Sequence, residues 1–330
     1  MLTKIFLQME DFLSYCQSKG LSQKTIFSYD QTLKLFAKYL EVEHGITDAT
    51  FVTEQVIREY IMSLQERGKY TVVSKDDTKK WNNPDARTDK GKPITKSTIN
   101  NYIRNIKVFF NFLDEYDMIR KNPVIKIKQL RNPRKAKDFI NDRDFNNLIK
   151  CLDLSKYSEY RDYTIIQLII DTGMRLGECL LLQMQDIDIN ERCIVLKAEN
   201  TKGKAERVVF YSSEMGVLMR RWIQFKDRYV ESEYLFPSKS YKTKIRVSNF
   251  EKNFRIYCSR VGLKDVTPHT LRNNFAKRFL MAGGDIYTLS RILGHSSVTV
   301  TEKAYLDLTD KDIKKNYQRY SPLAQIKKSK

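Results

Sequence analysis

Six side chains in the second half of the chain have the types needed to act on a phosphate group. They are two arginines, a lysine, two histidines and a tyrosine: Arg175, Lys202, His269, Arg272, His295 and Tyr305. Arginine and lysine pair with anionic oxygens, histidine transfers protons near neutral pH, and tyrosine is a potential nucleophile. The set is suited to phosphoryl transfer that runs on cationic side chains and a protein nucleophile.

The motifs around these residues indicate where each one lies. Arg175 stands in "DTGMRLGE", after a glycine that ends one helix and at the start of another, where free backbone N–H groups also suit an anion. Lys202 stands at the tip of a predicted hairpin, "ENTKGK", with Lys204 two residues further on. His269 and Arg272, in "PHTLRNN", fall on one face of a predicted helix.

Two further candidates follow towards the carboxyl end. His295 lies in the glycine-set turn "LGHSS", and Tyr305 comes ten residues later. Each signal is weak alone, because an arginine or tyrosine on a surface, or a histidine in a turn, is more often structural than catalytic. The residue types by themselves therefore support no more than nucleic-acid binding.

The charge of the chain favours a polyanionic partner. Lys and Arg total 59 against 40 Asp and Glu, a formal net charge of +19 in 330 residues. An excess of this size points to nucleic acid more than to solubility alone. A metal-dependent route would need carboxylates clustered in an apolar setting, which the sequence does not suggest, and "TGMRLGE" lacks the ending of a nucleotide-binding loop. We expect neither a metal nor another cofactor.

Cysteine usage and hydropathy bear on the setting of the protein. The five cysteines are odd in number and show no CxxC spacing, which is typical of a reduced cytoplasmic protein without a zinc site. The apolar run "TIIQLII" is too short to span a membrane, and no signal peptide is recognisable. We expect a cytoplasmic, prokaryotic protein that acts on DNA.

Helical periodicity dominates the first ~120 residues. After Ser22, a predicted N-cap, apolar residues recur at steps of three and four, and a second stripe follows near residue 100. The members are Ile26, Tyr29, Leu33, Phe36 and Leu40, then Ile99, Ile103, Ile106, Phe110 and Leu113. Residues 70–94 are polar, carry no such stripe, and are predicted to form a long loop or irregular β excursion.

A basic segment separates the two halves. Residues 120–137 hold eight basic residues, no acidic ones and two prolines, so we place an interdomain linker at 123–138. Such a linker can lie along a phosphate backbone. The predicted DNA-backbone contacts are Lys126, Lys128, Arg131, Arg134 and Lys135.

The pattern after the linker is mixed. "YRDYTIIQLIID" predicts a buried helix ending near Gly173, and "RCIVLKA" and "ERVVFYS" predict the strands of a hairpin with Gly203 at its turn. Helices resume to the end. The expected fold is mainly α with two domains: a helical amino-terminal domain, 1–122, and a mostly α domain, 139–330, with a small antiparallel sheet.

The order of the motifs resembles the tyrosine recombinases, or phage-type integrases, over nearly the whole chain. "TGMRLGE" is similar to the family's first-arginine box, "NTKGKAERVVF" to its hairpin lysine motif, "HTLRNNFA" to its HxLRHxFA box, and "LGHSSVTVTEKAY" to the box that leads to the nucleophile. Four ordered motifs are specific. The resemblance implies a SAM-like core-type DNA-binding domain followed by the recombinase catalytic domain.

The resemblance also implies a role for each candidate. Arg175 and Arg272 would grip the scissile phosphate, and Tyr305 would attack it to form a 3′-phosphotyrosyl link. Lys202 would protonate the leaving 5′ oxygen. His269 would serve proton transfer, and His295 would hydrogen-bond the phosphate.

The implied partner is double-stranded DNA with inverted-repeat core sites, bound by a homotetramer on two duplexes that exchanges strands through a Holliday junction. The implied role is integration or excision of a mobile element, a transposon or phage. Chromosome or plasmid dimer resolution, type IB topoisomerase activity and a catalytically silent DNA-binding protein stay open as alternatives. The tail after Tyr305 is either a helix that docks on a subunit or a frayed basic terminus.

Overall fold

The structure is a computed structural model that describes residues 3–72, 84–132, 139–201, 203, 205–305, 317, 321 and 323, without the side chains of Pro84 and of residues 303–305. Lys202, Arg134 and Lys135 lie outside this part of the chain, as do most of the carboxyl-terminal tail and the middle of the 70–94 segment. Over the described residues, no helix combines the length and hydropathy that a membrane span requires.

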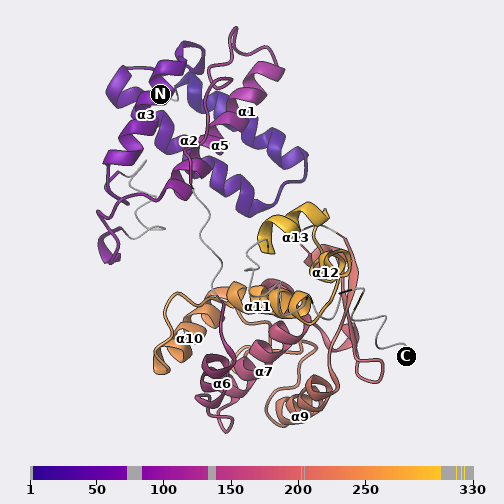
Figure 1. The fold of residues 1–330 in the computed structure, drawn as a ribbon. Coiled ribbons are helices and arrows are strands. Elements are labelled where there is room, and N and C mark those ends of the chain that lie inside the picture. Colours follow the sequence, from indigo (N-terminus) through magenta and orange to yellow (C-terminus); the bar gives the residue numbers. More distant parts are fainter. Residues whose placement is uncertain are drawn as a thin grey trace. The chain divides into compact units, whose positions relative to one another are not determined.

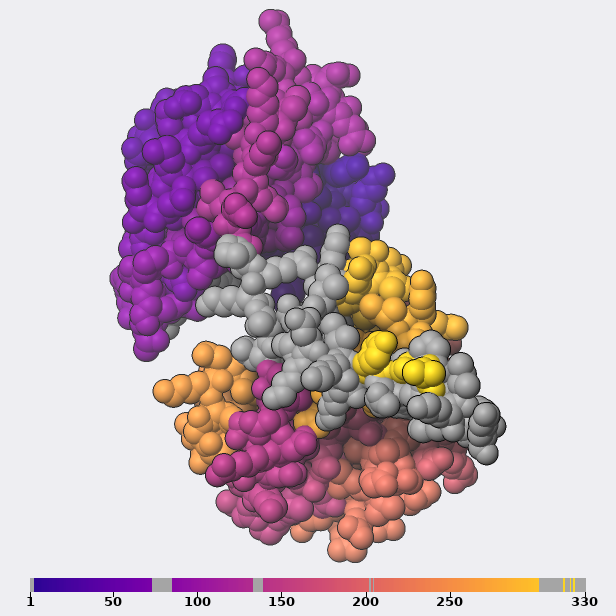
Figure 2. Space-filling model, in the orientation of Figure 1, coloured from indigo at the N-terminus to yellow at the C-terminus, as the bar shows by residue number. Residues whose placement is uncertain are grey.

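The chain divides into two compact units, residues 1–134 and 135–330 (Figures 1 and 2). The described elements of the first are α1 (Lys4–Ser18), α2 (Gln23–His44), the 3-10 turn η1 (Ala49–Phe51), α3 (Glu54–Glu66), the 3-10 turn η2 (Pro84–Ala86) and α5 (Lys96–Glu115). The predicted cap is confirmed, because Ser22 Oγ accepts a hydrogen bond from the Thr25 backbone N–H at 3.2 Å. Thr95 caps α5 in the same way.

The two predicted apolar stripes form the core of this first unit. Leu33, Phe36 and Leu40 of α2 are buried against α5, whose Ile103 and Phe110 are buried in turn. Burial of these side chains is the main stabilising contribution, at roughly 25 cal/mol per Å² of apolar surface. The helical prediction for this half is confirmed.

The start of the predicted linker is part of this unit. Val124 and Ile127 are buried in its core, and the Asn100 side chain bonds both the backbone N–H and the backbone carbonyl of Leu130, at 2.7 and 2.9 Å. Lys107 Nζ donates to the Ile127 carbonyl at 2.8 Å. Residues 124–130 are therefore held against α5, although composition placed them in the interdomain linker 123–138.

The second unit is mainly helical and carries one three-stranded sheet. Its helices are α6 (Asp142–Lys150), α7 (Tyr157–Thr172), α8 (Leu176–Cys179), α9 (Ser213–Tyr229), α10 (Val247–Arg260), α11 (Pro268–Met281), α12 (Ile286–Leu293) and α13 (Val298–Tyr305). The strands are β1 (Ile187–Asp188), β2 (Cys193–Leu196) and β3 (Arg207–Phe210), with 3-10 turns η3 (Met184–Asp186) and η4 (Ala198–Asn200).

Helix α7 is the central element of this unit. It packs against α11 and α9, and Ile165, Ile166 and Ile169 have no exposed surface. On α9, the fully buried Trp222 donates its indole N–H to the Leu235 carbonyl at 2.9 Å. At the end of α10, Arg260 donates to the Glu159 carboxylate of α7 at 2.8 Å. Gly173, in the left-handed region at φ +68°, ends α7 as predicted.

The predicted hairpin is present with a longer connection than a tight turn. Strands β2 and β3 are antiparallel in the register Cys193–Phe210 to Leu196–Arg207, and β1 adds a strand beside β2 that the sequence analysis did not predict. Inward-facing Ile194 and Val209 are fully buried, which holds the sheet against the helices. The mainly helical fold with a small antiparallel sheet is confirmed.

Candidate active site

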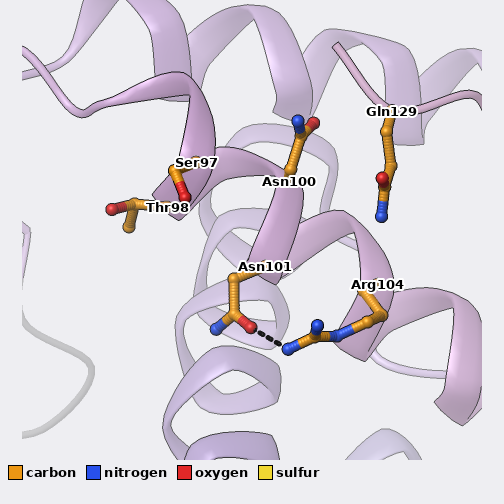
Figure 3. Close-up of a pocket in the computed structure, with 6 residues that line it drawn as sticks. All are labelled: Ser97, Thr98, Asn100, Asn101, Arg104 and Gln129. Carbon is orange, nitrogen blue, oxygen red and sulfur yellow. Dashed lines mark hydrogen bonds between the residues drawn. The ribbon is translucent and has the colours of Figure 1, made fainter. Parts of the chain in front are cut away.

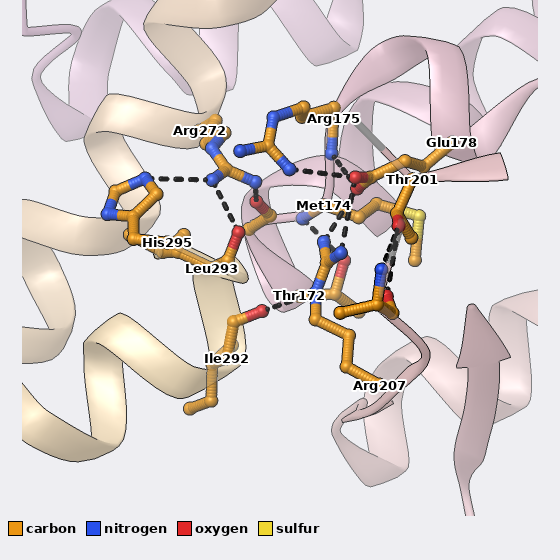
Figure 4. A network of polar contacts seen from close by, with 12 residues as sticks. Thr172, Met174, Arg175, Glu178, Thr201, Arg207, Arg272, Ile292, Leu293 and His295 are labelled. Atoms are coloured by element: carbon orange, nitrogen blue, oxygen red, sulfur yellow. Dashed lines mark hydrogen bonds and ion pairs between the residues drawn. The ribbon is translucent and has the colours of Figure 1, made fainter. Parts of the chain in front are cut away.

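Arg272 is the centre of a polar network that joins segments far apart in the sequence. Its guanidinium is buried, with 2% of the residue exposed. Nη1 donates to the Gly173 carbonyl at 2.8 Å and Nη2 to the Leu293 carbonyl at 2.7 Å (Figure 4). Nη2 also lies 3.1 Å from His295 Nε2. One side chain of α11 therefore links the end of α7 to the end of α12.

The position of this cation explains why it is tolerated away from water. Gly173 follows α7 and Leu293 is the last residue of α12, so both acceptors lie at helix carboxyl ends. Carbonyls there lack intrahelical partners and carry the negative end of the helix dipole. They compensate part of the cost of burying the charge. A side chain at Gly173 would collide with Phe275, whose ring atoms lie 2.3 Å from a built Cβ.

His295 is held in one tautomer. A guanidinium only donates, so Nε2 accepts from Arg272, and Nδ1 then carries the proton and donates to Thr301 Oγ1 at 2.7 Å. Thr301 is fully buried on α13, the helix that ends at Tyr305. The imidazole therefore connects the buried arginine to the helix that carries the predicted nucleophile. The side chain of Tyr305 lies outside the described part of the chain.

Arg175 reaches the same network through Glu178. Its Nη1 donates to Glu178 Oε1 at 2.8 Å, and its backbone N–H donates to Oε2 at 2.9 Å. Free backbone N–H groups near Arg175 were expected to suit an anion, and the N–H of Arg175 itself is instead bonded to Glu178, which caps the short helix α8. The Arg175 side chain keeps 30% of its surface exposed.

Arg207 is a site residue that the sequence analysis missed. From the start of β3 it donates to both carboxylate oxygens of Glu178, at 2.6 and 3.2 Å, and through Nε to the Ile292 carbonyl at 2.9 Å (Figure 4). Glu178 was missed too. Its position three residues after Arg175 is a capping signal, whereas Arg207 has no local signal because its partners are 29 and 85 residues away.

The hairpin connection that carries Lys202 is closed by a buried threonine. Thr201 Oγ1 accepts from the Ala205 N–H at 3.1 Å and lies 2.9 Å from the Ala205 carbonyl oxygen. Lys202 and Lys204 themselves lie outside the described residues. The proposed general acid therefore sits on a segment whose two ends are fixed to each other.

His269 lies in the first turn of α11 and is exposed to solvent, one turn before Arg272. Pro268 occupies the first position of this helix, and the Thr267 N–H donates to Thr270 Oγ1 at 3.1 Å, which sets where the helix begins. The shared helical face predicted for His269 and Arg272 follows from this start.

A groove of about 710 Å³ runs between the hairpin and α12. Phe210 and Val208 contribute one wall, and Arg291, Gly294 and His295 contribute the other. His295 thus lines an open surface on one side and the buried network on the other. This opening gives a large substrate access to the imidazole.

The first unit has a polar groove of its own, of about 450 Å³, on the amino-terminal half of α5 (Figure 3). Ser97, Thr98, Asn101 and Arg104 line it together with Gln129, and Arg104 Nη2 donates to Asn101 Oδ1. Amide and guanidinium groups of this kind match the hydrogen-bonding groups of base edges and phosphates. Lys126, Lys128 and Arg131 are exposed on the segment that follows α5.

Carboxylates do not gather into a metal site within the described residues. The Asp-x-Asp spacing of Asp186 and Asp188 is structural. Asp186 accepts from the Gln183 N–H at 2.9 Å and pairs with Lys197, while Asp188 accepts from the Asn190 and Glu191 N–H groups. Both carboxylates are used in turns.

The Glu178 carboxylate has a pKa below its usual value. Burial alone would raise that pKa, but hydrogen bonds from Arg207 and from the Arg175 backbone outweigh burial. The charged carboxylate therefore stabilises the fold above the ordinary glutamate pKa of about 4.3. This stabilisation is lost as the pH falls through the lower, folded-state pKa.

Glu178→Gln should lower the thermal midpoint at pH 7, and the gap from wild type should narrow below a pH of about 4. The reason is that acid removes the charge that the substitution has already removed. Thermal unfolding at both pH values measures the gap. Glu251→Gln, at an exposed position on α10, is the matched control. A gap that stays constant down to pH 3 would contradict the charge assignment.

Comparison with known proteins bears on this geometry. The sequence profile described as "Phage integrase family" matches residues 139–312, which hold every residue of the network. The profile described as "Phage integrase, N-terminal SAM-like domain" matches residues 9–75. The chain belongs to the phage integrase family of tyrosine recombinases. It has a SAM-like amino-terminal domain and a tyrosine recombinase catalytic domain, which confirms the predicted family and enzyme class.

Relatives match over nearly the full length of the chain. Tyrosine recombinase XerD of Staphylococcus haemolyticus is 25% identical over 328 residues, covering 96% of this chain and 99% of the relative. The Tn1549 transposon integrase in complex with transposon right end DNA has a TM-score of 0.72 at 17% identity, over 97% of this chain and 99% of that one.

A third similar protein is the XerH site-specific recombinase bound to palindromic difH substrate. It has a TM-score of 0.67 at 18% identity and covers 94% of this chain and 84% of the other. At these identities the two solved structures show a shared fold. The family assignment rests on the profile matches. The DNA bound in these complexes was bound by those proteins.

Proposed function

We propose that this tyrosine recombinase breaks and rejoins double-stranded DNA at specific sites through a 3′-phosphotyrosyl intermediate. The observation that carries the proposal is the network around Arg272. Arg272 bonds His295 and the Leu293 carbonyl, and Arg175 is linked through Glu178 and Arg207 to the carbonyl of the adjacent Ile292, so residues predicted from three separate motifs come together. Buried and fixed cationic donors stabilise the added negative charge of a pentacovalent phosphate.

The proposed reaction conserves the energy of the DNA backbone. Tyr305 Oη attacks the phosphorus and forms an Oη–P bond, the phosphorus keeps its bond to the 3′ oxygen, and its bond to the 5′ oxygen breaks. Lys202 donates the proton to that leaving oxygen, and His269 takes the tyrosine proton. Rejoining reverses these transfers with a 5′-hydroxyl of the partner strand, so the reaction needs no ATP.

Both ring nitrogens of His295 are engaged within the network. Its Nδ1 proton is committed to Thr301 and its Nε2 lone pair to Arg272. The ring therefore fixes the position of Arg272, and it donates to phosphate only after these bonds rearrange on DNA binding. We propose that role together with those of Arg175 and Arg272.

DNA with inverted-repeat core sites is the proposed substrate, bound by a tetramer on two duplexes. The palindromic difH substrate of the structurally similar XerH supports inverted repeats. We propose that residues 1–122 bind the core site, that 139–330 form the catalytic domain, and that the stretch 123–138 contacts the DNA backbone. The polar groove on α5 offers a surface for base contacts within the first unit.

The proposed biological role is integration or excision of a mobile element, supported by the fold shared with the Tn1549 transposon integrase. Dimer resolution is the second candidate, favoured by the match to XerD over 96% of this chain. The identity of the target DNA distinguishes these two roles. Element ends recovered in the covalent complex would support the first, and a single chromosomal or plasmid site would support the second.

The proposed reaction is tested by incubating the full chain with fragments of its host genome, denaturing, and sequencing the DNA that stays covalently bound. Recovery of discrete sites, followed by joining of two plasmids that carry them, is expected. Removal of supercoils at many sequences without joining would indicate a type IB topoisomerase instead. Absence of any covalent DNA would overturn the proposal.

Binding to DNA should weaken steeply with salt, because displaced counterions drive it. With six or more phosphate contacts, affinity should fall about 10³-fold or more between roughly 50 and 200 mM salt. The double change Lys126→Gln and Lys128→Gln should reduce the log–log slope by about 2. Exposed Lys252 and Lys264, replaced in the same way, are the control. An unchanged slope would remove Lys126 and Lys128 from the interface.

A further inference from the structure

Arg207 is a nearly buried side chain that hydrogen-bonds to two other segments of the site. The side chain is 10% exposed, and each of its three nitrogens donates to an acceptor. Two bonds reach Glu178 in α8, and the third reaches the Ile292 carbonyl near the end of α12. Arg207 itself starts β3, the strand that follows the Lys202 connection.

These bonds join the segments that carry three proposed catalytic residues. Glu178 holds Arg175 by its side chain and its backbone. Ile292 stands three residues before His295, and Leu293 between them accepts from Arg272. A shift of the hairpin therefore moves the partner of Arg175 and the turn before His295 at the same time.

The charges show why a second arginine is needed beside Glu178. Arg175 and Glu178 alone form an ion pair with no net charge, and that pair would offer little attraction to a phosphodiester of charge −1. With Arg207 the group of three side chains carries +1. A carboxylate bonded by two guanidiniums also pulls less strongly on Arg175, which leaves Arg175 to bind the phosphate while Glu178 fixes its direction.

The backbone at Gly294 fits this guanidinium closely. A Cβ built on Gly294 would lie 2.8 Å from Arg207 Nη1 and 2.9 Å from Cζ, and Gly294 has φ +63°. Glycine favours the left-handed turn before His295 and leaves room for the Arg207 guanidinium. The conformation of the Gly294 turn and the position of the Arg207 guanidinium therefore depend on each other.

We propose that Arg207 is a positioning residue of the active site: it balances the charge of Glu178, so that the group keeps a net positive charge and Arg175 stays aimed at the scissile phosphate, and it bonds the hairpin to the turn before His295. This inference deepens the proposed function and rests on it. Arg207 is not assigned contact with DNA.

The test measures the rate of covalent-complex formation in a single turnover at saturating DNA, together with DNA affinity and the thermal midpoint. Arg207→Gln should slow the rate by about 10²-fold, the scale for losing one fixed electrostatic contact, with affinity within about threefold of wild type. Arg207→Lys keeps the charge but not the fork, so we expect a loss of about 10-fold. Arg220→Gln, at an exposed position on α9, removes the same charge and should cut at the wild-type rate.

A double-mutant cycle separates positioning from support of the fold. In a Glu178→Gln background there is no carboxylate to neutralise, so Arg207→Gln should then cost less than about 10-fold in rate. A general structural role would give the same rate loss in both backgrounds.

The outcomes are decisive in each direction. Wild-type rates in Arg207→Lys and Arg207→Gln overturn the inference, as does the full rate loss in the Glu178→Gln background. If Arg207→Gln does not fold, Arg207→Lys decides the matter, since a wild-type rate in that variant overturns the inference as well. Failure of the proposed function has a different signature, because the wild-type chain itself would then form no covalent complex.

Discussion

Tyr305→Phe should abolish covalent attachment to DNA while leaving DNA binding unchanged. Phenylalanine lacks the oxygen that would bond to phosphorus, and loss of a covalent nucleophile costs about 10⁵-fold or more in rate. The change removes no group that is needed to contact the DNA backbone. The measurement is a denaturing gel of the protein with a nicked substrate that traps the cleaved strand, alongside a binding isotherm.

Tyr287→Phe is the matched control, because Tyr287 is 69% exposed on α12 and has no assigned role. This variant should form the adduct at the wild-type rate. An adduct that persists in Tyr305→Phe would refute the nucleophile assignment. Peptide mapping of that adduct would then identify the tyrosine that does react.

Arg272→Lys should impair both cleavage and stability. A lysine ammonium cannot donate to the Gly173 and Leu293 carbonyls in the fork geometry of a guanidinium and also reach His295. Each buried acceptor left unpaired costs about 1–3 kcal/mol of unfolding free energy. The cleavage rate should fall by about 10³-fold, the upper range for one fixed electrostatic donor.

Single-turnover cleavage and denaturant unfolding measure the two losses separately. Arg255→Lys, at an exposed position on α10, is the control and should change neither. If Arg272→Lys retains wild-type stability, the hydrogen bonds of the buried Arg272 guanidinium do not contribute to the stability of the fold. If it retains wild-type cleavage, Arg272 does not bind the phosphate.

Local signals in the sequence were sufficient to predict these helices and strands. The Ser22 cap, the apolar stripes of α2 and α5, the glycine stop at Gly173 and the β2–β3 hairpin all depend on neighbours within a few residues. Helix caps, apolar periodicity and left-handed turns depend on residues that are close in the sequence, so a single sequence is enough to predict them. The order of the four motifs was also evident in the sequence, and it indicated the tyrosine recombinase family.

The tertiary structure alone decided how the motifs meet. Arg272 and Gly173 are 99 residues apart, and Arg207 and Ile292 are 85 apart. No periodicity encodes such pairs, because they arise only when α11 packs against both α7 and α12 and α12 packs against β3. The docking of Val124 and Ile127 on the first unit was hidden for the same reason: composition marked the segment as basic, while burial of two apolar side chains decided where it lies. The sequence determined which side chains are available for the chemistry, and packing determined that Glu178 and Arg207 hold them in place.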